Sequence, residues 1–340
     1  MHVLFFFFRS LFSHIEKPLL GIIMRPKFGI HFEPLFGFDY KTIEEITLKA
    51  ERLGFDSVWT CDHFFKDQDS IDTNSLEAWT LLTALATKTS SMQLGVMVTG
   101  NSYRNPAMLA KIAATLDMIS EGRLILGIGA GWKEVEYRAY GYRFPPLKER
   151  MDRLEEALQV IRALWTEDRA NFDGEYYQLR DAVFAPKPVQ KPHPPILIGG
   201  HGEKRTLRMV AKYGDMSNFS PWASERLDRL LKVLKQHCRD LNRNFDEISK
   251  TFLGYCLITE DENEIHKFNQ KRAHEQGISV AAYLEKQSSL PGSWAGSPEE
   301  ISAQYEHLLG MGFTHFPLLF PYEREIEMSE KFVHSVLPFL

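Results

Sequence analysis

From residue 27 to the end of the chain, segments typical of β-strands alternate with segments typical of α-helices. The first predicted helix shows the pattern clearly, because Ile43, Ile46, Ala50 and Leu53 recur at helical spacing and would share one buried face. Strands that alternate with helices form parallel β-α-β units. We predict eight strands, at residues 27–32, 57–63, 93–98, 123–129, 196–200, 215–220, 250–259 and 315–320. The sequence therefore predicts an α/β fold, a single (β/α)8 TIM barrel.

An open, doubly wound sheet would give the same alternation. A dinucleotide-binding sheet of that kind normally carries a G-x-G-x-x-G turn after its first strand, and no such turn follows Phe32. We therefore favour the closed barrel. Two segments interrupt its pattern: Asp173-Gly174 predicts a hairpin insertion after the fourth helix, and residues 277–296 predict an inserted loop or lid before the last strand.

Composition excludes several classes of function. The 340 residues are 44% hydrophobic and 25% charged, which is normal for a globular protein with a large core. The net charge is 40 − 45 = −5, so we expect no contact with nucleic acid or an anionic membrane surface. The three cysteines are widely spaced, which predicts neither a disulfide framework nor a zinc site, and a cytoplasmic location fits best.

The first 23 residues lie outside the barrel pattern. Residues 3–8 form an apolar run, but a membrane-spanning helix needs about 20 apolar residues. A secretory signal would carry positive charge before this run and a small-residue cleavage site after it, and the sequence matches neither feature. We therefore expect a poorly ordered extension over residues 1–23, in preference to a cleaved signal, and a barrel domain over residues 24–340.

In a TIM barrel, functional residues lie at the C-terminal ends of the strands. The fifth predicted strand ends in Gly199, Gly200, His201 and Gly202, before a helix expected to start near Glu203. Glycines let backbone N–H groups approach an anion, and a helix N-terminus carries partial positive charge. We expect a phosphate here, although a tight turn without a ligand would use the same glycines.

The fourth predicted strand ends in Gly127, Gly129 and Gly131, followed by Trp132. We interpret these glycines as leaving space for a flat ring, and close packing of strand against helix is the alternative. Trp132 and Glu136 could both line a cofactor pocket, with ordinary loop packing as their alternative role.

Asp62 and His63 end the second predicted strand. Histidine is the side chain best suited to proton transfer near neutral pH, and both residues are candidate catalytic groups. Adjacent strand residues point to opposite faces of a sheet, so in the alternative interpretation one of the two is structural. The spacing of the His, Asp and Glu residues predicts no metal site.

Six motifs together resemble the luciferase-like monooxygenase superfamily, at residues 59–64, 105–111, 115–117, 120–124, 127–132 and 194–200. The resemblance extends from about residue 27 to the end of the chain, and residues 105–132 carry its most specific part. This superfamily contains monooxygenases that use reduced FMN and enzymes that use the deazaflavin coenzyme F420. The segment at residues 98–106 is most similar to the F420-dependent branch.

The resemblance implies a planar ring across the barrel mouth and a phosphate on the turn at residues 199–202. Val96, Met97 and Thr99 would contact the ring, on a strand end that in relatives often holds a non-proline cis peptide, expected here near Val96–Met97. His63 matches the histidine that transfers a proton in a deazaflavin-dependent relative.

The sequence departs from the family pattern in two places. Residues 64–67 lack the tryptophan that some relatives place after the Asp-His pair, which puts a sugar-phosphate dehydrogenase role in doubt. Residues 215–218 depart from the usual Asp-x-Trp-Asn, which puts ring or substrate contacts there in doubt.

These observations predict an oxidoreductase in which coenzyme F420 exchanges a hydride with a small organic substrate. A monooxygenase that uses reduced FMN is the first alternative, and a non-catalytic flavin-binding protein is the second. A barrel that acts on a phosphorylated metabolite without flavin would need carboxylates or lysines at several strand ends, and Asp62 is the one strong candidate. The substrate is not readable from the sequence, and a homodimer is an expectation from the family alone.

Overall fold

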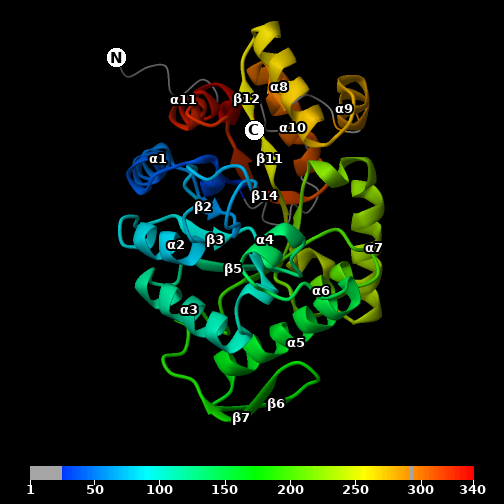
Figure 1. The fold of residues 1–340 in the computed structure, drawn as a ribbon. Helices are drawn as coiled ribbons and strands as arrows, with labels where there is room; N and C mark the ends of the chain where they lie inside the picture. Colours follow the sequence, from blue (N-terminus) through cyan, green and yellow to red (C-terminus); the bar gives the residue numbers. More distant parts are fainter. Residues whose placement is uncertain (1–24, 289, 291–293) are drawn as a thin grey trace, which may run out of the picture.

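The computed structural model describes residues 25–288, 290 and 294–340, so the extension predicted for residues 1–23 lies outside the described residues. Eight parallel strands form a closed ring, because β1 pairs with both β2 and β14 (Figure 1). In ring order they are β1 (Lys27–Phe32), β2 (Ser57–Thr60), β3 (Gln93–Val96), β5 (Leu124–Gly129), β8 (Ile196–Gly199), β9 (Met216–Phe219), β10 (Ser249–Phe252) and β14 (Phe313–Leu319). The predicted TIM barrel is confirmed.

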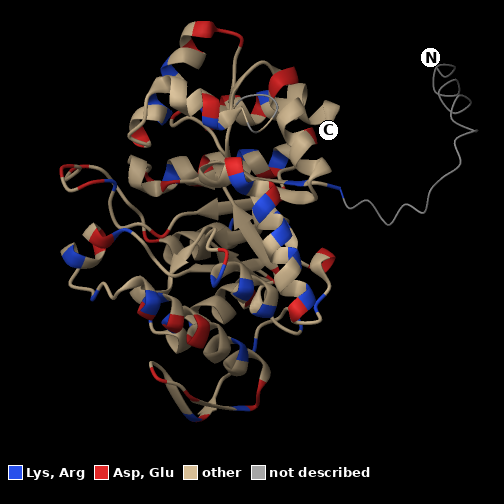
Figure 2. Cartoon of the chain, turned by 90° about the vertical axis from the view of Figure 1, so that its right-hand side faces the viewer, with Lys and Arg blue, Asp and Glu red and all other residues tan. Residues whose placement is uncertain are grey.

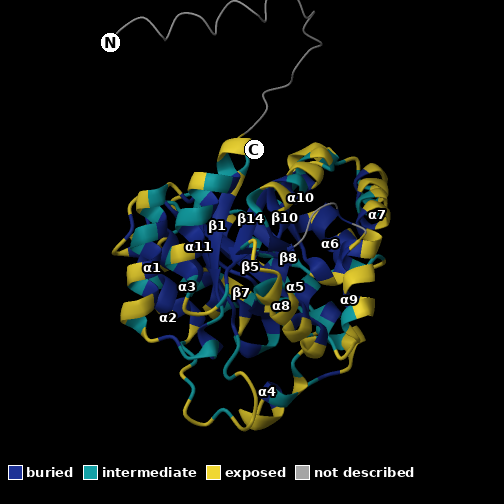
Figure 3. Ribbon diagram, turned by 90° about the horizontal axis from the view of Figure 1, so that it is seen from above, coloured by how far each residue is buried: buried dark blue, intermediate teal, exposed yellow. Residues whose placement is uncertain are grey.

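Helices surround the ring, with buried residues facing the strands and exposed residues on the outside (Figure 3). They are α1 (Tyr40–Leu53), α2 (Ala78–Ala86), α3 (Pro106–Ile119), α5 (Leu147–Thr166), α6 (Thr206–Tyr213), α7 (Leu227–Asp240), α10 (Pro298–Gly310) and α11 (Glu325–Lys331). In α1, Asp39 caps the first turn by accepting a hydrogen bond from the N–H of Thr42. Gly54 ends the helix at a φ of 89°, a conformation that glycine adopts without strain.

Two insertions leave the barrel pattern. β6 (Arg169–Asp173) and β7 (Gln178–Val183) form an antiparallel hairpin after α5 (Figure 1). The segment at residues 277–296, expected to be a loop, contains the helix α9 (Val280–Gln287) and the short strand β13 (Ala295–Gly296). This segment follows α8 (Glu262–Glu275), and β13 pairs with β12 (Leu257–Ile258) in a separate two-stranded sheet.

Three barrel strands end clearly earlier than expected: β2 ends at Thr60, and two others are interrupted. The seventh predicted strand divides into β10, β11 (Gly254–Tyr255) and β12. The third ends at Val96, the short strand β4 (Thr99–Gly100) follows beyond its predicted end, and the peptide bond between Met97 and Val98 is cis. The non-proline cis bond expected near Val96–Met97 therefore lies one residue further along the chain.

Polar side chains share the barrel interior with Trp59. Ser57 Oγ accepts a hydrogen bond from Trp59 Nε1 at 2.8 Å and lies 2.8 Å from His315 Nε2. Burial lowers the pKa of His315 to about 3, with a smaller contribution from the nearby Lys27. The buried His31 has a pKa of about 3, again because of burial first and then the charge of His63. Both interior histidines are therefore neutral at physiological pH.

These neutral histidines predict how stability depends on pH. An unfolded histidine protonates near pH 6.5 whereas His315 resists protonation down to about pH 3, so its contribution is complete above pH 6.5 and is lost on acidification. His315→Gln should therefore reduce the fall in unfolding free energy between pH 7 and pH 5 by about 2 kcal/mol. Urea unfolding at both pH values measures this, with the exposed His334→Gln as control. An unchanged pH dependence in His315→Gln would contradict the buried neutral state.

The surface carries both signs of charge. Figure 2 shows lysine, arginine, aspartate and glutamate interspersed over the helices of the face in view. Within the described residues, no helix combines the length and the apolar character that crossing a membrane requires. The same part of the chain contains no group of three or more His, Cys, Asp or Glu residues able to hold a metal ion.

Candidate active site

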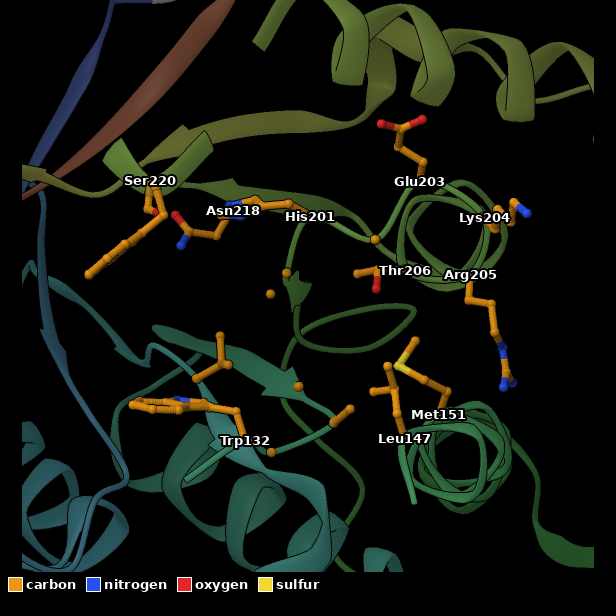
Figure 4. Close-up of a pocket in the computed structure, with 18 of the residues that line it drawn as sticks. Trp132, Leu147, Met151, His201, Glu203, Lys204, Arg205, Thr206, Asn218 and Ser220 are labelled. Carbon is orange, nitrogen blue, oxygen red and sulfur yellow. The ribbon is translucent and has the colours of Figure 1, made fainter. Parts of the chain in front are cut away.

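A cavity of about 1010 Å³ opens where the barrel strands end. It is bounded by residues that follow β3, β5, β8 and β9, together with the first turns of α5 and α6 (Figure 4). All these strands present their C-terminal ends to the cavity, which is where parallel barrels place their functional groups. The cavity therefore lies where the sequence predicted a site.

Met97 and Val98 form the floor of this cavity. A Cβ atom added to Gly129 or to Gly199 would lie 2.9 Å from a methyl group of Val98, so both glycines make room for that side chain. Gly127 lies against the carbonyl oxygen of Val96, where a Cβ would overlap it. The glycines at 127 and 129 thus allow close packing of neighbouring strands. Gly129 and Gly131 also line the cavity, so the space for a ring stays a prediction.

The turn after β8 forms one end of the cavity. Gly199, Gly200, His201 and Gly202 all line it, and Gly200 has a φ of 120° that glycine tolerates best. The helix that follows begins at Thr206, three residues later than expected, because residues 203–205 form a turn. In the described structure the backbone N–H groups of residues 200–202 donate no hydrogen bond, so they are free to bind an anion.

Two further groups near this turn favour an anion. Figure 4 shows the Thr206 side chain directed into the cavity and the Glu203 side chain directed away from it. Arg226 also lines the cavity, and its guanidinium makes no ion pair with any described residue. Burial, with a smaller contribution from the charge of Arg226, lowers the pKa of His201 to about 4. His201 is therefore neutral at pH 7, and Arg226 supplies the positive charge.

Apolar and aromatic side chains form the other walls. Leu147 and Met151 project from α5 into one side of the cavity (Figure 4). Trp132, which follows β5, keeps 71% of its surface exposed although it lines the cavity. Asn218 faces the cavity from the opposite wall, and its Oδ1 accepts a hydrogen bond from Thr251 at 2.8 Å. Its amide nitrogen is left without a partner in the described structure.

A smaller cavity of about 150 Å³ adjoins the large one, and the two share Met97, Val98, Gly131 and Trp132. Asp62, His63, Thr99, Tyr103 and Lys133 also line this smaller cavity. The candidate proton-transfer residue therefore lies directly beside the cavity floor. Val96 is fully buried among the residues that pack between strands and helices and lines neither cavity. We revise its predicted cofactor contact, because strand alternation turns its side chain away from the barrel interior.

Glu136 lies behind His63 and lines neither cavity, in contrast to its predicted place beside the cofactor. Its side chain is fully buried, and its Oε2 lies 3.0 Å from His63 Nδ1. The His63 ring also packs edge-on against Trp132, with ring centres 5.5 Å apart. Glu136 and Trp132 thus contact His63 from two sides.

Asp62 is occupied by an ion pair. Arg104 donates two hydrogen bonds to its carboxylate, at 2.6 and 2.9 Å, and the N–H of Gly100 donates a third at 3.2 Å. Burial raises the pKa of Asp62, and the bonds from Arg104 oppose that shift. Although Asp62 reaches the smaller cavity, its carboxylate is held by Arg104 and Gly100 and forms no hydrogen bond with His63 in the described structure.

Sequence reasoning missed several groups of this site. Tyr103 lies within the segment at residues 98–106 that carried the resemblance, yet nothing in the pattern indicated that its hydroxyl would donate to Glu136 at 2.8 Å. Arg226 lies in an irregular segment before α7 and had no signal at all.

Comparison with known proteins gives three findings. The profile of the luciferase-like monooxygenase family matches residues 20–315. An F420-dependent glucose-6-phosphate dehydrogenase from Amycolatopsis mediterranei is 30% identical over 322 residues, which is 88% of this chain and 94% of that protein. A pyrimidine monooxygenase from Allorhizobium ampelinum is 32% identical over 229 residues, which is 64% of this chain and 59% of that protein.

One solved structure extends the comparison to the fold. An F420-dependent secondary alcohol dehydrogenase in complex with an F420-acetone adduct superimposes with a TM-score of 0.77. The two sequences are 22% identical, and the match covers 93% of this chain and all of that chain. The two proteins share the fold.

Proposed function

The chain belongs to the luciferase-like monooxygenase family, and from this premise we propose that it is an F420-dependent oxidoreductase acting on a small organic substrate. The observation that supports this best is the arrangement of the large cavity, which has free backbone N–H groups at one end and His63 beside its floor. A phosphorylated planar ring requires an anion site, which the N–H groups provide, and a flat apolar floor, beside which His63 can exchange a proton.

The residues present fit such a cofactor. The N–H groups of Gly200, His201 and Gly202 would bind a phosphate, with Arg226 balancing its charge. Met97 and Val98 would lie beneath a ring whose edge reaches Gly131 and Trp132. The walls would exclude water from one face of the ring, and the substrate would approach the other.

When bound, coenzyme F420 would supply the ring that gives or takes a hydride. The protein then has to place a proton donor or acceptor beside that ring and hold both in register. His63 is the side chain in the smaller cavity best suited to that role, because histidine is the side chain most often used as a general acid or base. Thr99 and Trp132 would limit how far the ring can shift toward it.

Cofactor binding tests this proposal directly. We expect the purified protein to bind F420 with a saturating change in the cofactor's absorbance or fluorescence, and to bind FMN more weakly by at least about tenfold. Titration of the protein with each cofactor separately measures both affinities. Binding of FMN with no binding of F420 would support the monooxygenase alternative instead, and binding of neither would refute the proposed site.

The substrate is proposed only as a small organic molecule. The relative from Amycolatopsis mediterranei is a glucose-6-phosphate dehydrogenase, but residues 64–67 of this chain lack the tryptophan that some relatives place after the Asp-His pair. A panel of alcohols, carbonyl compounds and glucose 6-phosphate, tested with F420 in either redox state, would identify the class.

We also propose that the protein works in the cytoplasm as a homodimer. Cys61, Cys238 and Cys256 are all free and buried, which suits a reducing compartment. The outer face of α3 exposes Met108 and Met118, and such apolar residues often mark a subunit contact. Sedimentation of the purified protein measures the oligomeric state.

A further inference from the structure

We propose that Glu136 is a positioning residue that holds the imidazole of His63 with its proton on Nδ1 and its Nε2 directed to the cavity. This inference rests on the proposed function for its catalytic consequence. Its structural part concerns the chain alone and is independent of any cofactor. It also replaces the predicted role of Glu136 as a cofactor ligand.

The contact between the two side chains dictates the position of the proton. A carboxylate accepts hydrogen bonds but donates none. Because Glu136 Oε2 lies 3.0 Å from His63 Nδ1, that nitrogen has to carry the proton. In the neutral imidazole Nε2 is then unprotonated, and no described residue forms a hydrogen bond with it. Nε2 is therefore free to exchange a proton with a molecule in the adjoining cavity.

Glu136 stays charged because several donors converge on it. Oε1 accepts hydrogen bonds from the N–H of Phe64 and from Lys133 Nζ, both at 3.0 Å, and Oε2 accepts one from the Tyr103 hydroxyl at 2.8 Å. Burial alone would raise the pKa of this carboxyl, but the bonds from His63, Lys133 and Tyr103 outweigh it and lower the pKa to about 2. The carboxylate is therefore ionised throughout the physiological range.

These donors also fix where the carboxylate lies. Glu136 belongs to the short helix α4 (Glu134–Ala139), whereas Phe64 follows β2 and Tyr103 follows β4. Since α4 itself follows β5, segments after three different strands meet at one carboxylate. Its oxygens therefore cannot move without breaking several hydrogen bonds. His63 consequently receives a rigid acceptor, which is what a proton-transfer group needs for accurate placement.

Other titratable groups face His63 less directly. His31 and Glu33 on the β1 side and Lys133 before α4 interact with this region through charge. Burial raises the pKa of Glu33, a shift that the charges of His63 and Arg272 oppose, and burial keeps His31 neutral. Among the described residues, Glu136 is the carboxylate in hydrogen-bond contact with the ring.

A purely structural role for Glu136 is the competing explanation, because it also binds the N–H groups of Phe64 and Phe65. Glu51 offers a matched control. It too accepts hydrogen bonds from consecutive backbone N–H groups, those of Ser90 and Ser91 at 2.8 and 2.7 Å, but it touches no histidine. Glu51→Gln therefore tests the loss of a loop-holding carboxylate without the loss of a histidine partner.

The experiment compares Glu136→Gln with wild type and with Glu51→Gln. Glutamine keeps the shape of glutamate but removes the charge, and its amide can donate to Nδ1 and so permit the other tautomer. In cofactor-free protein, 15N NMR of the histidine side chains should show His63 protonated on Nδ1 in wild type and in Glu51→Gln. The signal is assigned by its absence in His63→Ala. Glu136→Gln should show a mixture of tautomers.

The catalytic readout uses the F420-loaded enzyme. We expect Glu136→Gln to lower kcat by about 10²-fold, the low end of what a positioned proton-transfer group contributes, with little change in KM. The pH profile of kcat should also differ from that of wild type, because the negative charge beside the imidazole is gone. Glu51→Gln should keep the wild-type kcat and profile.

The outcomes separate this inference from the proposed function. An unchanged His63 tautomer in Glu136→Gln, or an unchanged pH profile despite reduced kcat, would overturn the positioning role. Equal effects in Glu136→Gln and Glu51→Gln would show that loop support is the whole explanation. If F420 fails to bind while the NMR result holds, the positioning role stands and the proposed cofactor falls.

Discussion

Replacing His63 with alanine is expected to lower turnover by about 10²- to 10⁴-fold, the range that a positioned proton-transfer group contributes, while F420 affinity changes by less than about threefold. The reason is geometric. His63 lines the smaller cavity, whereas the predicted anion-binding turn and the apolar walls belong to the larger one. Single-turnover kinetics measures the chemical step, and equilibrium titration measures the affinity of the same protein.

Two controls make this prediction sharp. Added imidazole should restore part of the turnover of His63→Ala, because the deletion leaves space beside Trp132 that a free ring can fill. His193→Ala removes a histidine before β8, next to Pro194 and remote from the cavities, and should keep wild-type turnover. If His63→Ala lost turnover and F420 affinity in parallel, His63 would only position the ring of the cofactor.

The sequence predicted the fold well because the barrel depends on local patterns. Each strand is a short apolar run, and each helix has one apolar stripe at helical spacing. Both patterns are visible in the sequence without knowledge of distant contacts. Interruptions were harder to predict. The break between β3 and β4 occurs at the cis bond after Met97, in a segment where propensity alone favours a continuous strand.

The site could be predicted only in part, because local patterns place residues along the chain but do not determine the contacts between distant segments. His63 and the turn at residues 199–202 follow strands, so the topology of the barrel brought them to one end. Glu136 follows His63 by 73 residues, and whether its side chain faces the cavity or His63 depends on how α4 is rotated. Sequence spacing does not determine that rotation, so the predicted contact with the cofactor was misplaced.

The glycines of the fourth strand show a second limit. Their small size was read correctly as a need for space, but the group that uses the space was not identifiable. Val98 occupies the room left by Gly129 and Gly199. A requirement for glycine can thus be predicted from sequence, whereas the neighbour that imposes it comes from the packing of distant strands.

The second large effect is expected from Gly200→Asp, which should weaken F420 binding by about 100-fold or more. Gly200 lines the cavity, and the N–H groups of residues 200–202 donate to no described residue. A carboxylate placed there would lie within a few ångströms of the bound phosphate, and two like charges at about 4 Å repel by several kcal/mol near a protein surface. Each 1.4 kcal/mol corresponds to a tenfold loss of affinity.

Gly200→Asn separates charge from backbone strain. Gly200 has a φ of 120°, so any side chain at this position strains the turn, and asparagine matches aspartate in size. We expect Gly200→Asn to lose affinity by no more than about tenfold, as measured by the same titration, and both variants to unfold at similar temperatures. Inorganic phosphate should compete with F420 in wild type and fail to bind Gly200→Asp.

If Gly200→Asp and Gly200→Asn lost F420 affinity equally, the shape of the turn would matter and its charge would not. If Gly200→Asp bound F420 as well as wild type does, the phosphate would have to lie elsewhere, and the cofactor would be oriented differently in the cavity.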